Sequence, residues 1–246
     1  MSTKLAGELE KARNDLAELK AEYEEFVYIV SHDLSAPIRQ VEGFVEIITD
    51  KHANSFDDKT KRHFELINSG TFKAKQILDA VTGYSRINTL NEPYTLLDLN
   101  VVMDTVIDNL SSLIEKSNAS LTVGTLPTIM GSMKQIIKVF ECITHNALTY
   151  QKAGNQPDIK FSAIDKGDVW QFCINDNGIG VANNNIEKIF KVLRRGVSEK
   201  KYAGMGMGLA ISKKILQKHR GDIWLDAELE NGASFYFTIA KNLQND

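Results

Sequence analysis

Several features that would place this chain in a specialised class of protein are missing from its 246 residues. No apolar run approaches the ~18 residues that a membrane-spanning helix needs, and no signal peptide opens the sequence. The formal net charge of −3 offers no general attraction to nucleic acid or to an acidic membrane surface. We therefore expect a cytoplasmic protein that binds no nucleic acid and makes no membrane contact through this segment.

Cysteine is scarce, and the sequence has no internal repeat and no low-complexity tail. Cys142 and Cys173 fall inside a predicted helix and a predicted strand, so we interpret them as buried thiols in a reducing compartment. The apolar fraction of 43% and the charged fraction of 25% are ordinary for a globular protein. The length leaves room for two modest domains.

Apolar residues recur at alternating steps of four and three along residues 4–30. They are Leu5, Leu9, Ala12, Leu16, Leu19, Tyr23, Phe26 and Val30. This heptad spacing predicts a left-handed coiled coil, and a helix with so narrow an apolar stripe needs a partner in water. A second copy of the chain is the simplest partner, and packing on the chain's own domain is the alternative.

Two helices are predicted to form a hairpin. The first continues from the coiled coil through residues 26–50 and should bend at Pro37, because proline cannot donate to the carbonyl four residues earlier. The second runs from about 58 to 88, with apolar residues at three-four spacing. Doubled through the coiled coil, two such hairpins would form a four-helix bundle.

Short strands and helices alternate beyond Asn91-Glu92-Pro93, which we interpret as part of a linker over 91–94. Strands are predicted near 95–99, 121–123, 158–165, 169–175, 222–227 and 233–240, and helices at 101–117, 132–150 and 207–219. Asn100 and Ser132 are the expected helix caps. The fold class is therefore α+β with two domains, the second a sandwich with helices on one face of a mixed sheet.

The helical stretch Ser31-His32-Asp33-Leu34 contains a histidine that points away from the apolar seam. A neutral imidazole is a good nucleophile near pH 7, and Asp33 could hold the proton of one ring nitrogen so that the other attacks. Consecutive helix residues do not face each other, so Asp33 must reach the imidazole by its rotamer. On this stretch alone, an ordinary surface histidine is the alternative.

Two glycine clusters follow in the second half of the chain. In Asp176-Asn177-Gly178-Ile179-Gly180 a strand ends in a carboxylate that could accept a hydrogen bond from an adenine amino group. The sequence Asp176-Asn177-Gly178 is also common in hairpin turns, so a polar turn is the alternative. Gly204-Met205-Gly206-Met207-Gly208 directly precedes an amphipathic helix, where free backbone N–H groups can surround a phosphate. A flexible loop is the alternative there.

Three further side chains suit a nucleotide site. Asn146 lies in an apolar helix, and its carbonyl oxygen suits magnesium, although a buried amide with a satisfied hydrogen bond is the alternative. Arg194 and Arg195 precede the second glycine cluster and could neutralise phosphate charge during transfer.

Placed in this order, the stretches resemble the sequence boxes of the sensor histidine kinases, with the phytochrome-type branch closest. The resemblance covers nearly all of residues 20–246. The matching stretches are 26–37, Asn146-Ala147-Leu148, Asp176 to Gly180, Ile189-Phe190, Gly204 to Ile211, and Gly232 to Phe235.

The resemblance implies a division of the chain into a coiled-coil signalling helix (1–25), a dimerisation and phosphotransfer hairpin (26–90), the linker (91–94), and a catalytic ATP-binding domain (95–246) of the gyrase type. It implies an ATP-dependent homodimeric autokinase. This enzyme would phosphorylate His32 and pass the phosphoryl group to an aspartate in the receiver domain of a response regulator.

The site residues that we expect fall into three groups, with ATP and Mg²⁺ as cofactors. The catalytic residues are His32, Asp33 and Arg195. The cofactor-binding residues are Asn146, Tyr150, Asp176, Gly178, Gly180, Gly204, Gly206 and Gly208. Asn146 is also the expected metal ligand.

The chain departs from the family pattern at several positions, which are Ala36, Cys142, Thr149, Leu193 and Met205. Cys142 stands where an asparagine is usual, and Thr149 where a basic residue is common. These changes motivate an alternative function, a degenerate kinase that serves as a nucleotide-binding dimeric scaffold. A gyrase-like ATPase fits less well, because it has no use for an exposed His32.

Overall fold

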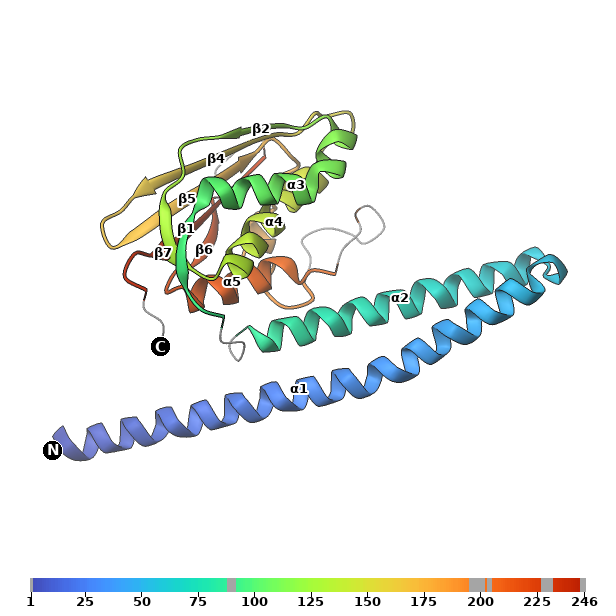
Figure 1. Ribbon diagram of the computed structural model, residues 1–246, viewed down its shortest axis with the longest axis horizontal. Coiled ribbons are helices and arrows are strands. Elements are labelled where there is room, and N and C mark those ends of the chain that lie inside the picture. The colour runs from blue at the N-terminus through green and yellow to red at the C-terminus, as the bar shows by residue number, and fades with distance from the viewer. Residues whose placement is uncertain (1, 88–91, 195–201, 203–204, 227–231, 244–246) are drawn as a thin grey trace. The chain divides into compact units, whose positions relative to one another are not determined.

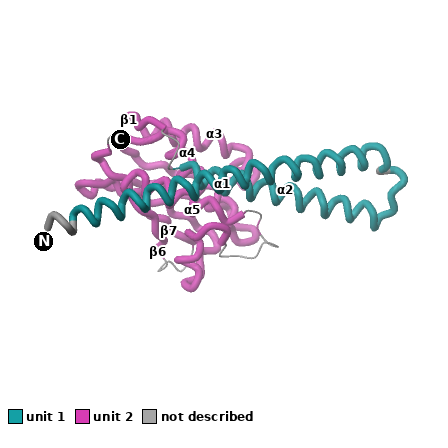
Figure 2. The backbone as a smooth tube through the Cα atoms, turned by 90° about the horizontal axis from the view of Figure 1, so that it is seen from below, with its two compact units in different colours: residues 1–90 teal, residues 91–246 magenta. Residues whose placement is uncertain are grey.

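The computed structural model describes residues 2–87, 92–194, 202, 205–226 and 232–243 (Figure 1). The chain divides into two compact units, residues 1–90 and 91–246, which are coloured separately in Figure 2. The elements of the first unit are all helices, and the second unit mixes helices with strands. The predicted fold class, a helical module followed by an α/β sandwich, is confirmed.

The first unit is an antiparallel hairpin of two long helices. These are α1 (Ser2–His52) and α2 (Asp58–Arg86), joined by a short 3₁₀ turn, η1 (Ala53–Ser55). Helix α1 continues without interruption through Pro37. Asp57 caps α2, because its carboxylate accepts a hydrogen bond from the Thr60 N–H at 2.7 Å. The cap satisfies one of the N–H groups that a helix start leaves without a partner.

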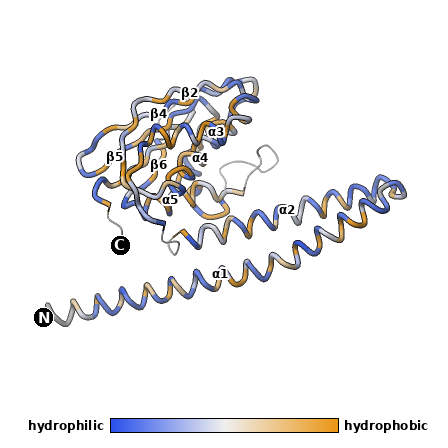
Figure 3. The backbone as a smooth tube through the Cα atoms, in the orientation of Figure 1, coloured by the Kyte–Doolittle hydropathy of each residue, from blue (hydrophilic) through white to orange (hydrophobic). Residues whose placement is uncertain are grey.

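One face of α1 keeps large apolar side chains exposed in the single chain. These residues, which we call the α1 stripe, are Tyr23, Phe26, Val30, Leu34, Val41, Phe44 and Ile48. Figure 3 shows hydrophobic positions recurring along both helices of the hairpin. Phe26 is 64% exposed and Phe44 57%. An exposed apolar surface of this extent usually marks a site of interaction. The hairpin alone therefore does not have a complete hydrophobic core.

The second unit contains two sheets. Strands β1 (Thr95–Asp98) and β3 (Thr128–Gly131) form an antiparallel pair. The larger sheet has the order β2-β4-β5-β7-β6, in which β2 and β4 are parallel and all other neighbours are antiparallel. Its strands are β2 (Ser120–Val123), β4 (Asp158–Asp165), β5 (Val169–Asp176), β6 (Ile223–Asp226) and β7 (Ala233–Ala240).

Three helices cover one face of the larger sheet (Figure 1). They are α3 (Leu99–Ser117), α4 (Met133–Thr149) and α5 (Gly208–Lys218), and a 3₁₀ turn, η2 (Asn183–Asn185), follows β5. The mixed sheet with helices on one face was predicted from the sequence. Ser132 caps α4 as predicted, with its hydroxyl accepting from the Gln135 N–H.

An aromatic cluster forms the centre of the sandwich core. Phe140 on α4 meets Phe172 on β5 and Phe237 on β7 edge-on, with ring centroids 6.0 and 5.4 Å apart. Phe172 and Phe237 stack on each other at 4.9 Å, and all three rings are fully buried. Because residues alternate between the two faces of a strand, every second side chain of β5 and β7 enters this core. The cluster therefore fixes α4 against the sheet.

The structure corrects two details of the prediction. The cap of α3 is Asp98 rather than Asn100, since the Asp98 carboxylate accepts from the Asn100 N–H at 2.9 Å. Asn100 lies in the first turn and donates its side-chain amide to the same carboxylate. Strand β3 was not predicted at all. No helix among the described residues is both long enough and apolar enough to cross a membrane.

Candidate functional site

His32 lies on an exposed face of α1. Its Nδ1 is 3.2 Å from Oδ1 of Asp33, and the two side chains are 70% and 72% exposed. An ionised carboxylate can only accept, so in the neutral ring Nδ1 carries the hydrogen and Nε2 keeps its lone pair. The rotamer of Asp33 thus brings together two residues that do not face each other along a helix. The neighbouring Ser31 is buried, which fixes the rotation of this turn of α1.

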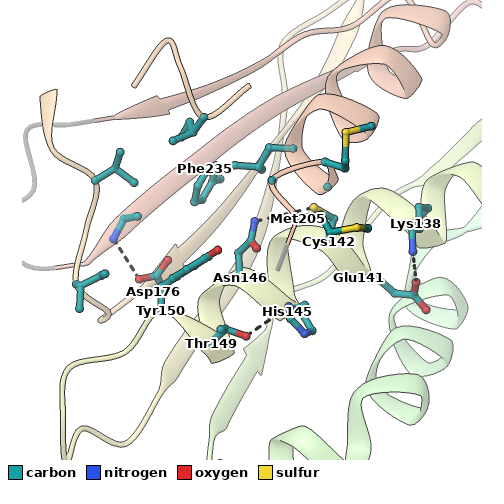
Figure 4. Close-up of a pocket in the computed structure, with 18 of the residues that line it drawn as sticks. Lys138, Glu141, Cys142, His145, Asn146, Thr149, Tyr150, Asp176, Met205 and Phe235 are labelled. Atoms are coloured by element: carbon teal, nitrogen blue, oxygen red, sulfur yellow. Dashed lines mark hydrogen bonds and ion pairs between the residues drawn. The ribbon is translucent and has the colours of Figure 1, made fainter. Parts of the chain in front are cut away.

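A cavity of about 480 Å³ opens in the sandwich (Figure 4). It lies where the second half of α4, the start of α5 and the ends of β5 and β7 meet. Its polar and reactive lining residues include Asn109, Lys138, Glu141, Cys142, His145, Asn146, Thr149, Tyr150, Asp176 and Arg194. Its apolar lining includes Ile179, Ile189, Met205, Met207 and Phe235. A volume of this size suits a nucleotide-sized ligand.

Asp176 is a buried carboxylate at the end of β5. Its Oδ1 accepts hydrogen bonds from the backbone N–H groups of Gly178, at 2.8 Å, and Ala233, at 3.2 Å. Burial raises the pKa of Asp176 to about 6, although these two bonds favour the charged form. Among the described residues both bonds end on Oδ1, so Oδ2 remains available to a ligand in the cavity.

Asn146 and Cys142 lie one turn apart on α4 and face each other. The Asn146 amide Nδ2 is 3.9 Å from the Cys142 sulfur, as the dashed line in Figure 4 marks. With Nδ2 directed to the thiol, the Asn146 carbonyl oxygen can serve a hard cation, which prefers oxygen ligands. Burial raises the pKa of the Cys142 thiol to about 11, so this group stays protonated and behaves as a small apolar filler.

The glycines of both clusters allow close backbone approach. A Cβ on Gly178 would collide with the carbonyl of Tyr150, and one on Gly208 would collide with the sulfur of Cys142. Gly180 and Gly206 also line the cavity, both with a φ of +70°, which favours glycine. Two predicted site residues, Arg195 and Gly204, lie outside the described residues.

Helix α5 presents its N-terminus to the cavity. It begins at Gly208, and Met207 in the cap position makes no side-chain capping bond. The first backbone N–H groups of the helix therefore remain available, and the dipole adds partial positive charge at this end. An anion such as a phosphate suits this position.

Tyr150 ends α4 at the rim of the cavity. Its ring meets Tyr202 edge-on at 5.1 Å, and the Tyr202 hydroxyl donates to the Gln151 carbonyl at 3.0 Å. The Tyr150 carbonyl accepts from the Ile179 N–H at 2.9 Å, which ties the first glycine cluster to the end of α4. Tyr202 was not among the predicted site residues.

Sequence reasoning did not place Lys138 or His145 in the site, and it treated Cys142 and Thr149 only as departures from the family pattern, although all four line the cavity. Thr149 is 3.4 Å from Nδ1 of His145, and Glu141 pairs with Lys138 at 4.0 Å and with Asn109 at 2.6 Å. Burial lowers the pKa of His145. Steps of three or four residues lead from Asn146 to 142 and 149, and from 142 to 138 and 145. Helical periodicity would therefore have identified these residues.

Of the predicted cofactor set, the residues that line this cavity are Asn146, Tyr150, Asp176, Gly180, Gly206 and Gly208. Gly178 does not line it but donates its N–H to Asp176. Within the described residues, no three His, Cys, Asp or Glu side chains are grouped to hold a metal ion. The oxygen of Asn146 fits a magnesium ion that takes its other ligands from phosphates and water. His32 and Asp33 belong to the other unit of the chain.

Comparisons with known proteins agree with this geometry. Residues 131–243 match the family model described as histidine kinase-, DNA gyrase B- and HSP90-like ATPase. Phytochrome-like protein Cph1 of Synechocystis is 33% identical over 235 residues, which cover 95% of this chain and 31% of Cph1. The chain thus spans about a third of the length of curated relatives that it matches.

Two solved structures share the fold. Full-length ShkA in complex with AMPPNP gives a TM-score of 0.67 at 19% identity, covering 90% of this chain and 47% of that chain. Histidine kinase ThkA in complex with the response regulator TrrA gives 0.60 at 20% identity, covering 94% and 66%. Residues 131–243 therefore form an ATPase domain of the histidine kinase, gyrase B and HSP90 type, and the chain as a whole is similar to sensor histidine kinases.

Proposed function

We propose that this chain is an ATP-dependent protein histidine kinase that phosphorylates its own His32. The observation that carries the proposal is the pairing of His32 with Asp33, which leaves Nε2 free on an exposed face. The cavity around Asn146 and Asp176, in a domain of the histidine kinase ATPase family, supplies a place for the nucleotide.

The nucleotide contacts follow from the donors and acceptors of the cavity. Oδ2 of Asp176 accepts a hydrogen bond from the adenine amino group. The N-terminus of α5, with Gly206 and Gly208, lies along the phosphates. Asn146 would hold magnesium through its carbonyl oxygen, and the ion supplies charge neutralisation on the phosphates when it is bound.

The transfer step uses the lone pair of Nε2 on His32. This lone pair attacks the γ-phosphorus, a nitrogen–phosphorus bond forms, and the bond from the γ-phosphorus to its bridging oxygen breaks. The electron pair of the broken bond leaves with ADP. Attack by a neutral imidazole leaves a positive ring, whose Nδ1 proton passes to Asp33 and then to water. Asp33 also fixes the tautomer before attack, as a base partner does in other nucleophilic sites.

We infer that the chain acts as a homodimer. The α1 stripe is apolar, exposed and spaced by threes and fours, which is the pattern of a helix seam that a second helix covers. A second copy of this chain offers the same stripe, and two hairpins would then complete a four-helix bundle.

The phosphohistidine then passes its phosphoryl group to an aspartate in the receiver domain of a response regulator. This step rests on the homology to sensor kinases and on the ThkA–TrrA complex, in which a kinase of the same fold binds a response regulator. The chain spans about a third of the length of these curated relatives.

Labelling with radioactive ATP tests the proposal. Wild-type protein should incorporate acid-labile phosphate from the γ-position, and His32→Ala should incorporate none while nucleotide binding by calorimetry is retained. His63→Ala, which removes another exposed histidine of the hairpin, is the matched control and should label normally. Binding of ATP without labelling in the wild type would favour the dimeric scaffold instead. Labelling that survives in His32→Ala would defeat the assignment.

A further inference from the structure

A guanidinium from α2 lies one helical turn from the imidazole of His32. The carbon Cζ of Arg86 is 4.1 Å from the centroid of the Tyr28 ring, which is a cation–π distance. Tyr28 precedes His32 by four residues on α1, and their ring centroids are 6.3 Å apart. Arg86 and His32 therefore both lie close to the Tyr28 ring, the cation on α2 and the nucleophile on α1.

Gly83 leaves open space on α2 about one turn before Arg86. The helices are antiparallel, so one turn forward on α1, from Tyr28 to His32, corresponds to about one turn back on α2, from Arg86 to Gly83. A Cβ built on Gly83 meets no atom within 4 Å. Gly83 therefore adds no side chain to this part of α2, which leaves room for the long side chain of Arg86.

Phosphorylation of His32 would create a need for such a cation. A phosphoryl group adds about −1.5 to −2 charges and three strong acceptor oxygens, next to the carboxylate of Asp33. Along α1 the basic residues that flank His32 are Lys20 and Arg39, about three and two turns away. A guanidinium matches phosphate oxygens in charge and in geometry, and its charge-assisted hydrogen bonds to them are about twice as strong as neutral ones.

We propose that Arg86 is a positioning residue for the phosphoryl group of His32, resting on the Tyr28 ring until the nitrogen–phosphorus bond forms and then binding the phosphoryl oxygens. Arg86 exchanges no proton in this step, because a guanidinium stays charged. It stabilises the product of the transfer described above, so the inference rests on the proposed phosphorylation of His32.

The test measures the equilibrium between phosphohistidine plus ADP and histidine plus ATP in the full chain. At a fixed ratio of ATP to ADP, Arg86→Gln should lower the phosphorylated fraction about tenfold, the effect of losing one charge-assisted hydrogen bond. Arg86→Lys should lose less, because it keeps the charge. Arg62→Gln, which removes another exposed arginine of α2, is the matched control and should behave as wild type.

Tyr28→Leu separates the proposed role from a structural one. This variant breaks the same cation–π pair as Arg86→Gln but keeps the guanidinium, so the phosphorylated fraction should stay within about twofold of wild type. Phosphorus NMR adds a direct signature. The phosphohistidine resonance should shift in Arg86→Gln and stay in place in Tyr28→Leu and Arg62→Gln.

The possible outcomes distinguish failure of the role of Arg86 from failure of the proposed kinase function. If Arg86→Gln and Arg86→Lys both reach the wild-type phosphorylated fraction with an unmoved resonance, the inference is wrong while the proposed kinase function stands. Equal losses in Arg86→Gln and Tyr28→Leu would show that the pair only stabilises the hairpin, which also overturns it. A wild type that never labels His32 would instead overturn the proposed function itself.

Discussion

The hairpin and the sandwich differ in how far they bury their large apolar side chains. In the sandwich, Phe140, Phe172 and Phe237 are fully buried and pack on one another. In the hairpin, Phe26 and Phe44 remain more than half exposed in the single chain. One module has a complete core of its own, and the other leaves large apolar side chains exposed, which the proposed dimer would bury. With this difference, a signal could change how the helices of the proposed dimer associate and leave the core around the nucleotide site unchanged.

Phe140→Ala should produce the largest effect and should be confined to the sandwich. Removing a buried phenylalanine from a packed core costs about 3–5 kcal/mol of folding free energy. Both tryptophans, Trp170 and Trp224, lie in the sandwich, so tryptophan fluorescence in denaturant reports this unit alone. The fluorescence midpoint should fall while the helical circular dichroism of the hairpin persists. A joint collapse of both signals would show that the sandwich and the hairpin are not separate cooperative units.

Phe44→Glu should act only on association. Burying one phenylalanine per chain is worth about 2 kcal/mol, so a symmetric dimer should lose about 4 kcal/mol, or about a thousandfold in dissociation constant. Light scattering across a dilution series measures this change. Glu46→Lys, on the opposite side of α1 from the stripe, is the control and should remain dimeric. Unchanged association in Phe44→Glu would exclude the α1 stripe from the interface.

Asp176→Asn should reveal how much folding free energy the burial of the Asp176 carboxylate costs. Burial raises the pKa of Asp176 to about 6 in the folded state. The contribution of this group to folding stability is therefore present at low pH and is lost as pH rises through 6. The amide keeps an oxygen for the two backbone N–H donors but carries no charge. We expect the variant to be more stable than wild type at pH 7.5 by about 1–3 kcal/mol, with the difference fading toward pH 4.

The same substitution should weaken adenine binding, which calorimetry with ATP can measure. The amide NH₂ replaces Oδ2, so a donor would face the donor amino group of adenine. We expect at least about a tenfold loss of affinity, the cost of leaving one buried polar group unpaired. A more stable protein that binds ATP equally well would contradict the assigned role of Asp176.

Periodicity predicted most of the fold because these elements are long and strongly patterned. Strand β4 was predicted with the bounds that it has, and α4 was predicted within one residue at each end, together with its cap. Strand β3 was missed because its four residues give no clear alternation, and it exists only through pairing with β1. The cap of α3 was misplaced because Asp98 and Asn100 are both good caps, and only tertiary packing chooses between them.

The site was less predictable than the fold. Glycine clusters and Asn146 carry local sequence signals, and Asn146, Gly180, Gly206 and Gly208 do line one cavity. The contacts of Tyr202, Cys142 and Arg86 depend on segments far apart in the chain, so no local pattern announces them. Gly208 illustrates the limit, since its requirement for a missing Cβ comes from a sulfur on another helix.

The most direct test of the whole account is to locate the phosphate after reaction with ATP. Trypsin cleavage after Lys20 and Arg39 gives a peptide of residues 21–39, in which His32 is the only histidine. We expect one acid-labile, alkali-stable phosphate on this peptide, and its absence when Asp176→Asn protein is used at low ATP concentration. Phosphate found on another peptide, or acid-stable phosphate on Ser31 or Ser35, would contradict the account.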